Sequence, residues 1–186
     1  MSHPWHNIPF SPDNKPHILN VYIEISSGSK IKYELDKDSG ILRVDRILSS
    51  SSVYPANYGF VPKTLGEDKD PLDAIVFSQS TFMPSSFVRA KPIGVLRMVD
   101  QGENDEKILC VALDDPWYRD LKSLDELPQH ELKEVRQFFM DYKKLENKMV
   151  EVLGFEDVEF GEKIILESVE RYKKMMREKE SKKDME

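Results

Sequence analysis

Three aspartates fall within the six residues Asp68-Lys69-Asp70-Pro71-Leu72-Asp73. Pro71 restricts the local backbone, and the apolar run Ala74–Phe77 that follows predicts a strand, so the acidic segment lies at a strand entrance. Carboxylates held this close repel one another unless a cation lies among them. Oxygen ligands of this kind suit Mg²⁺ or Mn²⁺. The segment is therefore a candidate metal site, and a solvated acidic turn is the alternative.

A second acidic stretch, residues 100–107, follows the apolar run Ile93–Val99. It offers Asp100 and Asp105 as further metal ligands, with Lys107 directly behind them. One acidic turn between strands means little alone. Two such turns together with scattered lysines, arginines and tyrosines are the composition that a site for a metal-bound polyanion needs. Carboxylates bind the metals there, while cations and phenols bind the phosphate oxygens that the metals leave free.

Several separated motifs, taken in order, match a known family. The chain resembles the soluble, magnesium-dependent inorganic pyrophosphatases of the single-domain, OB-barrel type. The acidic segment corresponds to the family signature, and Val53–Pro62 corresponds to a second landmark. The resemblance extends from about Ile18 to about Arg171. Three shorter segments fit in the right order: Ile31–Glu34, Val44–Arg46 and Asp141–Lys144.

The resemblance implies that a metal-activated water hydrolyses pyrophosphate to two phosphates, with several Mg²⁺ ions in each site and Mn²⁺ as a substitute. Asp70 matches the proposed general base. In the family, the counterparts of Asp68, Asp73 and Asp105 share one metal, and the second acidic turn, with Asp100, helps to hold another. The matches to substrate contacts are Lys32, Arg46, Tyr58, Lys107, Tyr142 and Lys143, and the matches to outer carboxylates that orient waters and lysines are Glu24 and Glu34.

Each matched residue also has a plain structural interpretation. One lysine or arginine taken alone is more often a surface charge, and Tyr142 lies on an apolar helical stripe, where it would be a core residue. Two positions depart from the family pattern. Lys69 stands where a small or uncharged polar residue is usual, and we expect it to point into solvent. Gln101 stands where some members have an acid, so a peripheral carboxylate is missing there.

Composition limits the possible partners. The chain has 186 residues, enough for one domain, and 34 acidic against 27 basic residues give a net charge of −7. That balance argues against nucleic acid but not against a small anion, because bound metals reverse the local charge. The lone Cys110 is expected to be buried and fits a reducing compartment. The N-terminal segment does not read as a secretory signal and no run is long enough to span a bilayer, so we expect a cytoplasmic enzyme without a membrane partner.

The periodicity of the apolar residues predicts strands in the first part of the chain. Val21, Ile23 and Ile25 alternate with Tyr22 and Glu24, the pattern of a half-buried strand. Residues 1–16 are expected to form an arm that packs on the domain or on a neighbour, and His3, His6 and His17 are expected to be surface histidines rather than metal ligands. Further strands are predicted at 31–34, 41–44, 87–90 and 107–113, with a tight turn at 38–40.

Helices are predicted in the second half. Ser123–Glu126 has the spacing of a capping box, Gln129–Leu145 has one apolar face, and a second helix runs from Phe160 to about Met176. Strands followed by helices indicate an α+β domain. The resemblance adds a five-stranded, OB-like closed β-barrel with two C-terminal helices packed on it, and it favours a homohexamer. We expect one domain over 1–186, with an N-terminal arm at 1–16 and a charged, frayed tail at 177–186.

Two other functions compete with this interpretation. The first is a metal-dependent hydrolase of another phosphoanhydride, such as a nucleotide, although the chain has no P-loop motif. The second is an OB-fold nucleic-acid module, which needs a basic groove with stacking aromatic residues and is disfavoured by the acidic composition.

Overall fold

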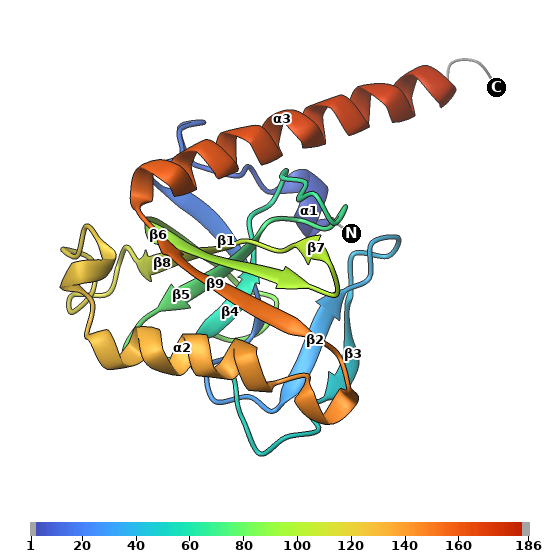
Figure 1. Ribbon diagram of the computed structural model, residues 1–186. Helices are drawn as coiled ribbons and strands as arrows, with labels where there is room; N and C mark the ends of the chain where they lie inside the picture. The colour runs from blue at the N-terminus through green and yellow to red at the C-terminus, as the bar shows by residue number, and fades with distance from the viewer. Residues whose placement is uncertain (1–2, 184–186) are drawn as a thin grey trace.

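A mixed β-sheet lies at the centre of the computed structural model, which describes residues 3–183 (Figure 1). The strands of this sheet are β1 (Leu19–Ile25), β4 (Asn57–Phe60), β5 (Asp73–Phe77), β6 (Phe87–Asp100), β7 (Glu103–Asn104), β8 (Lys107–Ala112) and β9 (Val150–Glu156). Pairing runs β1–β4–β5–β8–β6, and β6 also pairs with β1, so five strands form a cycle. Strands β7 and β9 pair with the later part of β6. The sheet with helices after most of its strands confirms the predicted α+β class.

One parallel pair determines where the two acidic stretches meet. Strands β5 and β8 are parallel, and Asp73 is the register partner of Lys107. Each of these residues is the first of its strand. The acidic segment enters β5 and the second acidic stretch enters β8, so both stretches lie at the same end of the pair. The prediction that the acidic segment lies at a strand entrance is confirmed.

A separate hairpin lies beside this sheet. It consists of β2 (Ile31–Leu35) and β3 (Leu42–Ile47), which pair only with each other among the described residues. Lys32 is the register partner of Arg46. Gly40 has a φ of 70° at the turn between the strands, where a side chain would be strained, and this agrees with the predicted tight turn.

Strand β1 departs from the prediction of a half-buried strand, because all seven of its residues are buried. Tyr22 packs in a cluster with Leu35 of the hairpin, Phe60 of β4 and Trp5 of the N-terminal segment. These elements cover the face that we expected to be open to water. The tight approach of β4 explains one residue of the second landmark, since a Cβ on Gly59 would lie 1.8 Å from the carbonyl oxygen of Tyr22.

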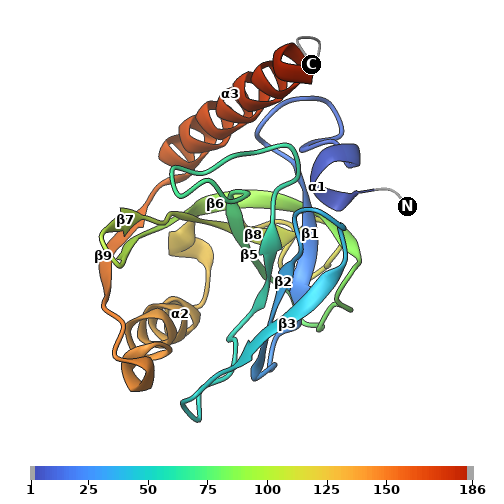
Figure 2. The same cartoon turned by 90° about the vertical axis from the view of Figure 1, so that its right-hand side faces the viewer.

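The helices lie on opposite sides of the sheet in Figures 1 and 2. Helix α2 spans Gln129–Asp141 and ends earlier than predicted, because a separate 3₁₀ turn at Lys144–Glu146 follows it. Helix α3 (Val158–Lys183) extends past Met176, so the tail is helical as far as Lys183, and the rest of it lies outside the described residues. None of the described helices has both the length and the apolar character needed to cross a membrane.

The predicted capping box is wrong. Ser123 precedes a 3₁₀ turn at Leu124–Glu126 and makes no side-chain cap, while Pro128 occupies the N-cap of α2. Glu126 accepts instead from the backbone N–H of Lys122, at 3.0 Å.

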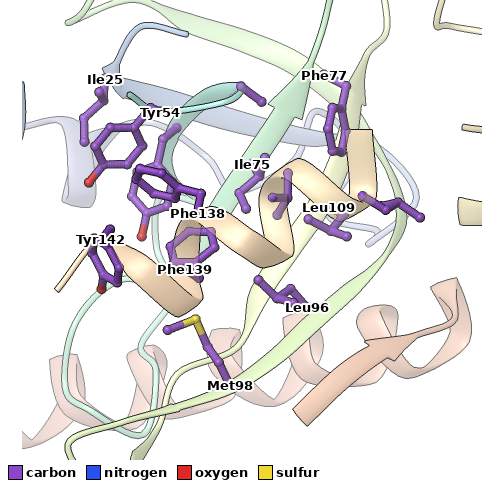
Figure 3. Packing of buried hydrophobic residues seen from close by; sticks show 14 of the residues in the cluster. Ile25, Tyr54, Ile75, Phe77, Leu96, Met98, Leu109, Phe138, Phe139 and Tyr142 are labelled. Atoms are coloured by element: carbon purple, nitrogen blue, oxygen red, sulfur yellow. The ribbon is translucent and has the colours of Figure 1, made fainter. Parts of the chain in front are cut away.

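Aromatic residues of α2 fill the space between this helix and the sheet, as Figure 3 shows for Phe138, Phe139 and Tyr142. Phe139 and Tyr142 pack edge to face with their ring centres 5.4 Å apart. On the other side, α3 packs Ile165 and Val169 on a second cluster that contains Cys110, whose thiol is buried as expected. Burial raises the pKa of this thiol above its ordinary value.

Candidate active site

Four of the predicted residues form one hydrogen-bonded group at the starts of β5 and β8 and on the neighbouring strand β4. The ammonium of Lys107 is 2.6 Å from Oδ2 of Asp73 and also donates to Asp105. The hydroxyl of Tyr58, on the neighbouring strand β4, donates to the same Oδ2 of Asp73 at 2.5 Å. Lys107 is only 2% exposed, so its charge acts with little screening by water. The group thus combines two predicted metal ligands with two predicted phosphate contacts.

The acidic segment folds back on itself before it enters β5. Oδ1 of Asp68 accepts from the backbone N–H of Asp70 at 3.0 Å, and the backbone N–H of Gly66 donates to the carbonyl of Asp70 at 2.6 Å. Lys69, between the two aspartates, has a φ of 69° and an exposed position. The expectation that Lys69 points into solvent is confirmed. Asp68 and Asp70 are thereby held at neighbouring positions on one short turn.

Burial, together with nearby negative charge, raises the pKa of several carboxyl groups. Burial, and then the nearby charges of Asp73, Asp70 and Asp105, raise the pKa of Asp68 to about 6, although the N–H of Asp70 opposes the shift. Burial and the charge of Asp73 raise the pKa of Glu24 to about 8. Burial also raises the pKa of Asp105, against the effect of Lys107. Excess negative charge in a partly buried space is the condition that a bound cation relieves.

The pKa of Lys107 is also raised, which for a lysine favours the charged form. Burial alone favours the neutral amine, but the charges of Asp105 and Asp73 outweigh it and hold the pKa of Lys107 well above its ordinary value. The lysine is therefore a permanent positive charge between these two carboxylates.

The site has two walls. The acidic residues at the starts of β5 and β8 form the first, and the β2–β3 hairpin forms the second, which is cationic. Lys32 and Arg46 both contact Asp45, at 3.3 Å and 2.9 Å respectively. Nε of Arg46 is also 3.1 Å from a carboxylate oxygen of Glu146, in the 3₁₀ turn after α2. Within residues 3–183, the buried Nη2 of Arg46 has no hydrogen-bond partner. An unpaired guanidinium N–H at this position is a donor available to an anion.

The end of α2 closes the site from another side. Lys143 pairs with Asp100 at the end of β6, while Tyr142 is buried under the guanidinium of Arg46, 6.0 Å from its ring centre. Burial lowers the pKa of Lys143 despite the attraction of Asp100. Tyr142 combines both interpretations offered by the sequence, because it packs in the core and borders the charged residues.

One hollow joins the acidic segment to the hairpin. It is lined by seven of the predicted residues, namely Glu24, Lys32, Glu34, Tyr58, Asp68, Asp70 and Asp73. Asp105 lies in a smaller hollow on the other side of Asp68 and Asp73, next to Asn104. The remaining predicted residues line neither of these hollows: Arg46, Asp100, Lys107, Tyr142 and Lys143.

The donor set fits a hard divalent cation. The described residues contain no group of three or more side chains already arranged around a metal position, because lysines contact the carboxylates instead. One buried oxygen is left over, since Oδ1 of Asp100 has no hydrogen-bond partner within residues 3–183. Carboxylate oxygens with raised pKa values and an unpaired oxygen are chemically suited to Mg²⁺ or Mn²⁺.

Three charged residues of the site were not predicted from the sequence. Lys37, in the hairpin turn, pairs with Asp70, and Asp45 and Glu146 hold the cations of the hairpin. Asp45 could have been found, because it lies beside Arg46 in a matched segment. No local pattern distinguishes Lys37 or Glu146, which reach the site only through the tertiary fold. His3 and His6 also differ from expectation, since they stack on one another, and His6 on Trp5, and are not free at the surface.

Comparisons with known proteins agree on one family. A model of the family described as "Inorganic pyrophosphatase" matches residues 21–173. Soluble inorganic pyrophosphatase 5 of Arabidopsis thaliana is 56% identical over 154 residues, which cover 83% of this chain and 71% of that protein. Soluble inorganic pyrophosphatase 2 of Chlamydomonas reinhardtii is 52% identical over 172 residues, with 92% and 88% covered.

Solved structures give the same result. The inorganic pyrophosphatase of Thermus thermophilus superposes with a TM-score of 0.88 at 32% identity, over 92% of this chain and 99% of that one. The enzyme of Helicobacter pylori superposes with a TM-score of 0.82 at 45% identity, over 86% and 95%. The chain belongs to the inorganic pyrophosphatase family. It is therefore a hydrolase of the inorganic diphosphatase class, and enzymes of this family are in general metal-dependent.

Proposed function

We propose that the chain hydrolyses inorganic pyrophosphate with Mg²⁺ as its preferred metal, Mn²⁺ as a substitute, and Asp70 as the general base. The observation that carries the proposal is the hollow in which Asp68, Asp70 and Asp73 face the cationic hairpin. A phosphoanhydride needs both charges at once: carboxylates for the metals, and cations for the phosphate oxygens.

In this proposal, the carboxylates of the site have different roles. Asp68, Asp73 and Asp105 would hold one metal, and Asp100 would help to hold another. Bound metals lower the pKa of a water and offset the charge of the phosphates. Glu24 and Glu34 orient waters and lysines around these ligands. Lys107 and Lys143, which contact these carboxylates, would supply ammonium groups to the phosphate oxygens.

Asp70 takes a proton from the attacking water while the oxygen of that water forms a bond to one phosphorus. The bond between that phosphorus and the bridging oxygen breaks, and the bridging oxygen leaves with the second phosphate. Two phosphates result from one pyrophosphate and one water. Lys32 and Arg46 on the hairpin, with Tyr58 and Tyr142, hold the substrate oxygens so that attack occurs in line. Nη2 of Arg46, which has no hydrogen-bond partner among residues 3–183, is the donor proposed for this role.

Phosphate release from purified protein tests the function. We expect release from pyrophosphate with Mg²⁺, slower release with Mn²⁺, and none in excess chelator. ATP is the decisive comparison, because seven of the twelve residues that line the hollow are charged, which suits a small polyanion better than a nucleoside. Equal rates on ATP and pyrophosphate would favour the rival hydrolase, and full activity in chelator would remove the metal from the mechanism.

We also propose three properties that lie outside the site. The cycle of five strands forms the closed, OB-type barrel, the enzyme acts in the cytoplasm, and it assembles as a homohexamer. Support for the location comes from the unpaired Cys110, which suits a reducing compartment. Support for assembly comes from the resemblance and from exposed apolar side chains such as Trp117 and Met149, which are 77% and 84% exposed. Light scattering after size exclusion gives the oligomeric state directly.

A further inference from the structure

The N-terminal segment, residues 3–18, lies before the part of the chain that the family model matches. Its short helix α1 (Pro4–Asn7) lies between the tip of the β2–β3 hairpin and helix α3 in Figure 2. We propose that this arm positions the substrate site, with Trp5 and His3 as positioning residues that hold the acidic segment and the hairpin tip in one arrangement. The inference rests on the proposed function of those two walls.

Trp5 holds the loop that leads into the acidic segment. Its indole N–H donates to the carbonyl of Thr64 at 2.9 Å, and its own carbonyl accepts from the backbone N–H of Lys63, also at 2.9 Å. Trp5 is 4% exposed and Thr64 is fully buried, so these bonds are shielded from water. The hydroxyl of Thr64 in turn accepts from the backbone N–H of Leu72, at 2.9 Å. Leu72 lies between Asp70 and Asp73, so the contact of Trp5 continues into the acidic segment.

His3 holds the hairpin tip. Its Nε2 is 3.0 Å from the carbonyl oxygen of Lys37, and a Cβ on Gly40 would lie 2.9 Å from its ring. A two-stranded hairpin has little stability by itself, so contacts with other elements fix where its tip lies. Because Lys32 and Arg46 are carried by the same hairpin, its orientation sets the position of both cations relative to the acidic segment.

The two contacts of the arm converge on one ion pair. The side chain of Lys37, whose carbonyl His3 contacts, pairs with Asp70, and Asp70 belongs to the segment that Trp5 supports through Thr64. The arm therefore connects the acidic segment with the hairpin, which form the two walls of the hollow. A third contact anchors the arm elsewhere: Nδ1 of His6 is 2.7 Å from the hydroxyl of Tyr172 on α3. That contact touches neither wall and provides a matched control.

Three variants of the full chain separate positioning from simple stabilisation. Trp5→Phe keeps an aromatic ring but deletes the N–H, and His3→Ala releases the hairpin tip. Tyr172→Phe keeps the packed ring and removes only the hydrogen bond between the arm and α3. We expect kcat/KM for pyrophosphate to fall roughly tenfold in the first two, less than the 10²-fold that a 1 Å displacement can cost. Trp5→Phe should act mainly on kcat, through Asp70, and His3→Ala mainly on KM, through Lys32 and Arg46. Tyr172→Phe should keep the wild-type values at temperatures where all proteins are folded.

Amide hydrogen exchange of the metal-free protein provides a readout without activity. The amide of Leu72 should exchange faster in Trp5→Phe, and the amide of Gly40, which donates to Asp36 at 2.8 Å, should exchange faster in His3→Ala. Both should stay at the wild-type rate in Tyr172→Phe. If the three variants share the same kinetics and the same exchange, the arm only stabilises the fold and the inference is wrong. If wild-type protein does not hydrolyse pyrophosphate, the proposed function fails, and the exchange experiment still decides the role of the arm.

Discussion

The two walls of the hollow are built in different ways. The acidic wall stands at the starts of β5 and β8 inside the main sheet, where Asp73 and Lys107 are register partners. The cationic wall is a hairpin outside that sheet, and its cations are held by ion pairs with Asp45 and Glu146. Backbone pairing of β5 with β8 fixes Asp73 and Lys107 relative to each other, while the position of the hairpin beside the sheet depends on side-chain contacts. We therefore expect substitutions in the acidic wall to cost more than equivalent substitutions in the hairpin.

Asp70→Asn should give the largest effect. The amide keeps the shape of the acidic segment but cannot accept the proton of the attacking water, so turnover should fall by roughly 10²–10⁴-fold. Asp114→Asn, at an exposed position paired with Arg89, is the matched control and should retain the wild-type rate. Steady-state phosphate release with Mg²⁺ measures both. A near-wild-type rate for Asp70→Asn would place the base elsewhere.

Lys107→Met tests the acidic wall through stability. Removal of this buried ammonium leaves Asp73 and Asp105 without their shared counter-charge, which should lower the free energy of unfolding by about 3–5 kcal/mol in metal-free protein. Arg89→Met breaks an exposed ion pair and should cost less than about 1 kcal/mol. Urea titrations give both values. Mg²⁺ should restore part of the loss in Lys107→Met, because a metal between the carboxylates replaces the missing charge. An equal loss of unfolding free energy in the two variants would show that Lys107 does not stabilise the pair of carboxylates Asp73 and Asp105.

Arg46→Ala tests the cationic wall and should have a smaller effect. A charge-assisted hydrogen bond is worth about 1.5–3 kcal/mol, so kcat/KM for pyrophosphate should fall by roughly 10–10²-fold, mainly through KM. The affinity for Mg²⁺ in the absence of substrate should change little, because Arg46 contacts Asp45 and Glu146 and none of the proposed metal ligands. Arg89→Ala serves as the control of the same residue type. Loss of metal affinity in Arg46→Ala would mean that the two walls are not independent.

The same contrast explains which features of the fold and of the site could be predicted from the sequence. An apolar run after an acidic segment is a local pattern, and it correctly predicted the strand that begins at Asp73. The apolar run around Cys110 likewise predicted β8. That these two strands are parallel neighbours is not a local property, and only the fold shows that it brings the two acidic stretches to one edge.

Predictions failed where distant segments decide the outcome. Strand β1 has an alternating pattern but is buried on both faces, because the arm and the hairpin cover the side of Tyr22 and Glu24. Lys37 and Glu146 enter the site from a turn and from the segment after α2, so no spacing in the sequence links them to Asp70 or Arg46. The boundaries of α2 and α3 also shifted, since helix ends depend on packing and capping that periodicity does not encode.

His6, which pairs with Tyr172 on α3, allows the smallest test. Burial, and then the charges of His3, Lys179 and Lys63, lower the pKa of His6 below its ordinary value of 6.5. The folded protein therefore favours neutral His6 more than the unfolded chain does. The stabilisation is fully present above pH 6.5 and is lost as the pH falls from there through the lower pKa of the folded state. Because His6 is only partly buried, water screens the effect, and we expect a fall in Tm of no more than about 2–4 °C, the shift that 1 kcal/mol gives in a domain of this size. In calorimetry between pH 8 and pH 5, His6→Gln should reduce this part of the pH dependence, and an unchanged slope would show that His6 does not contribute to it.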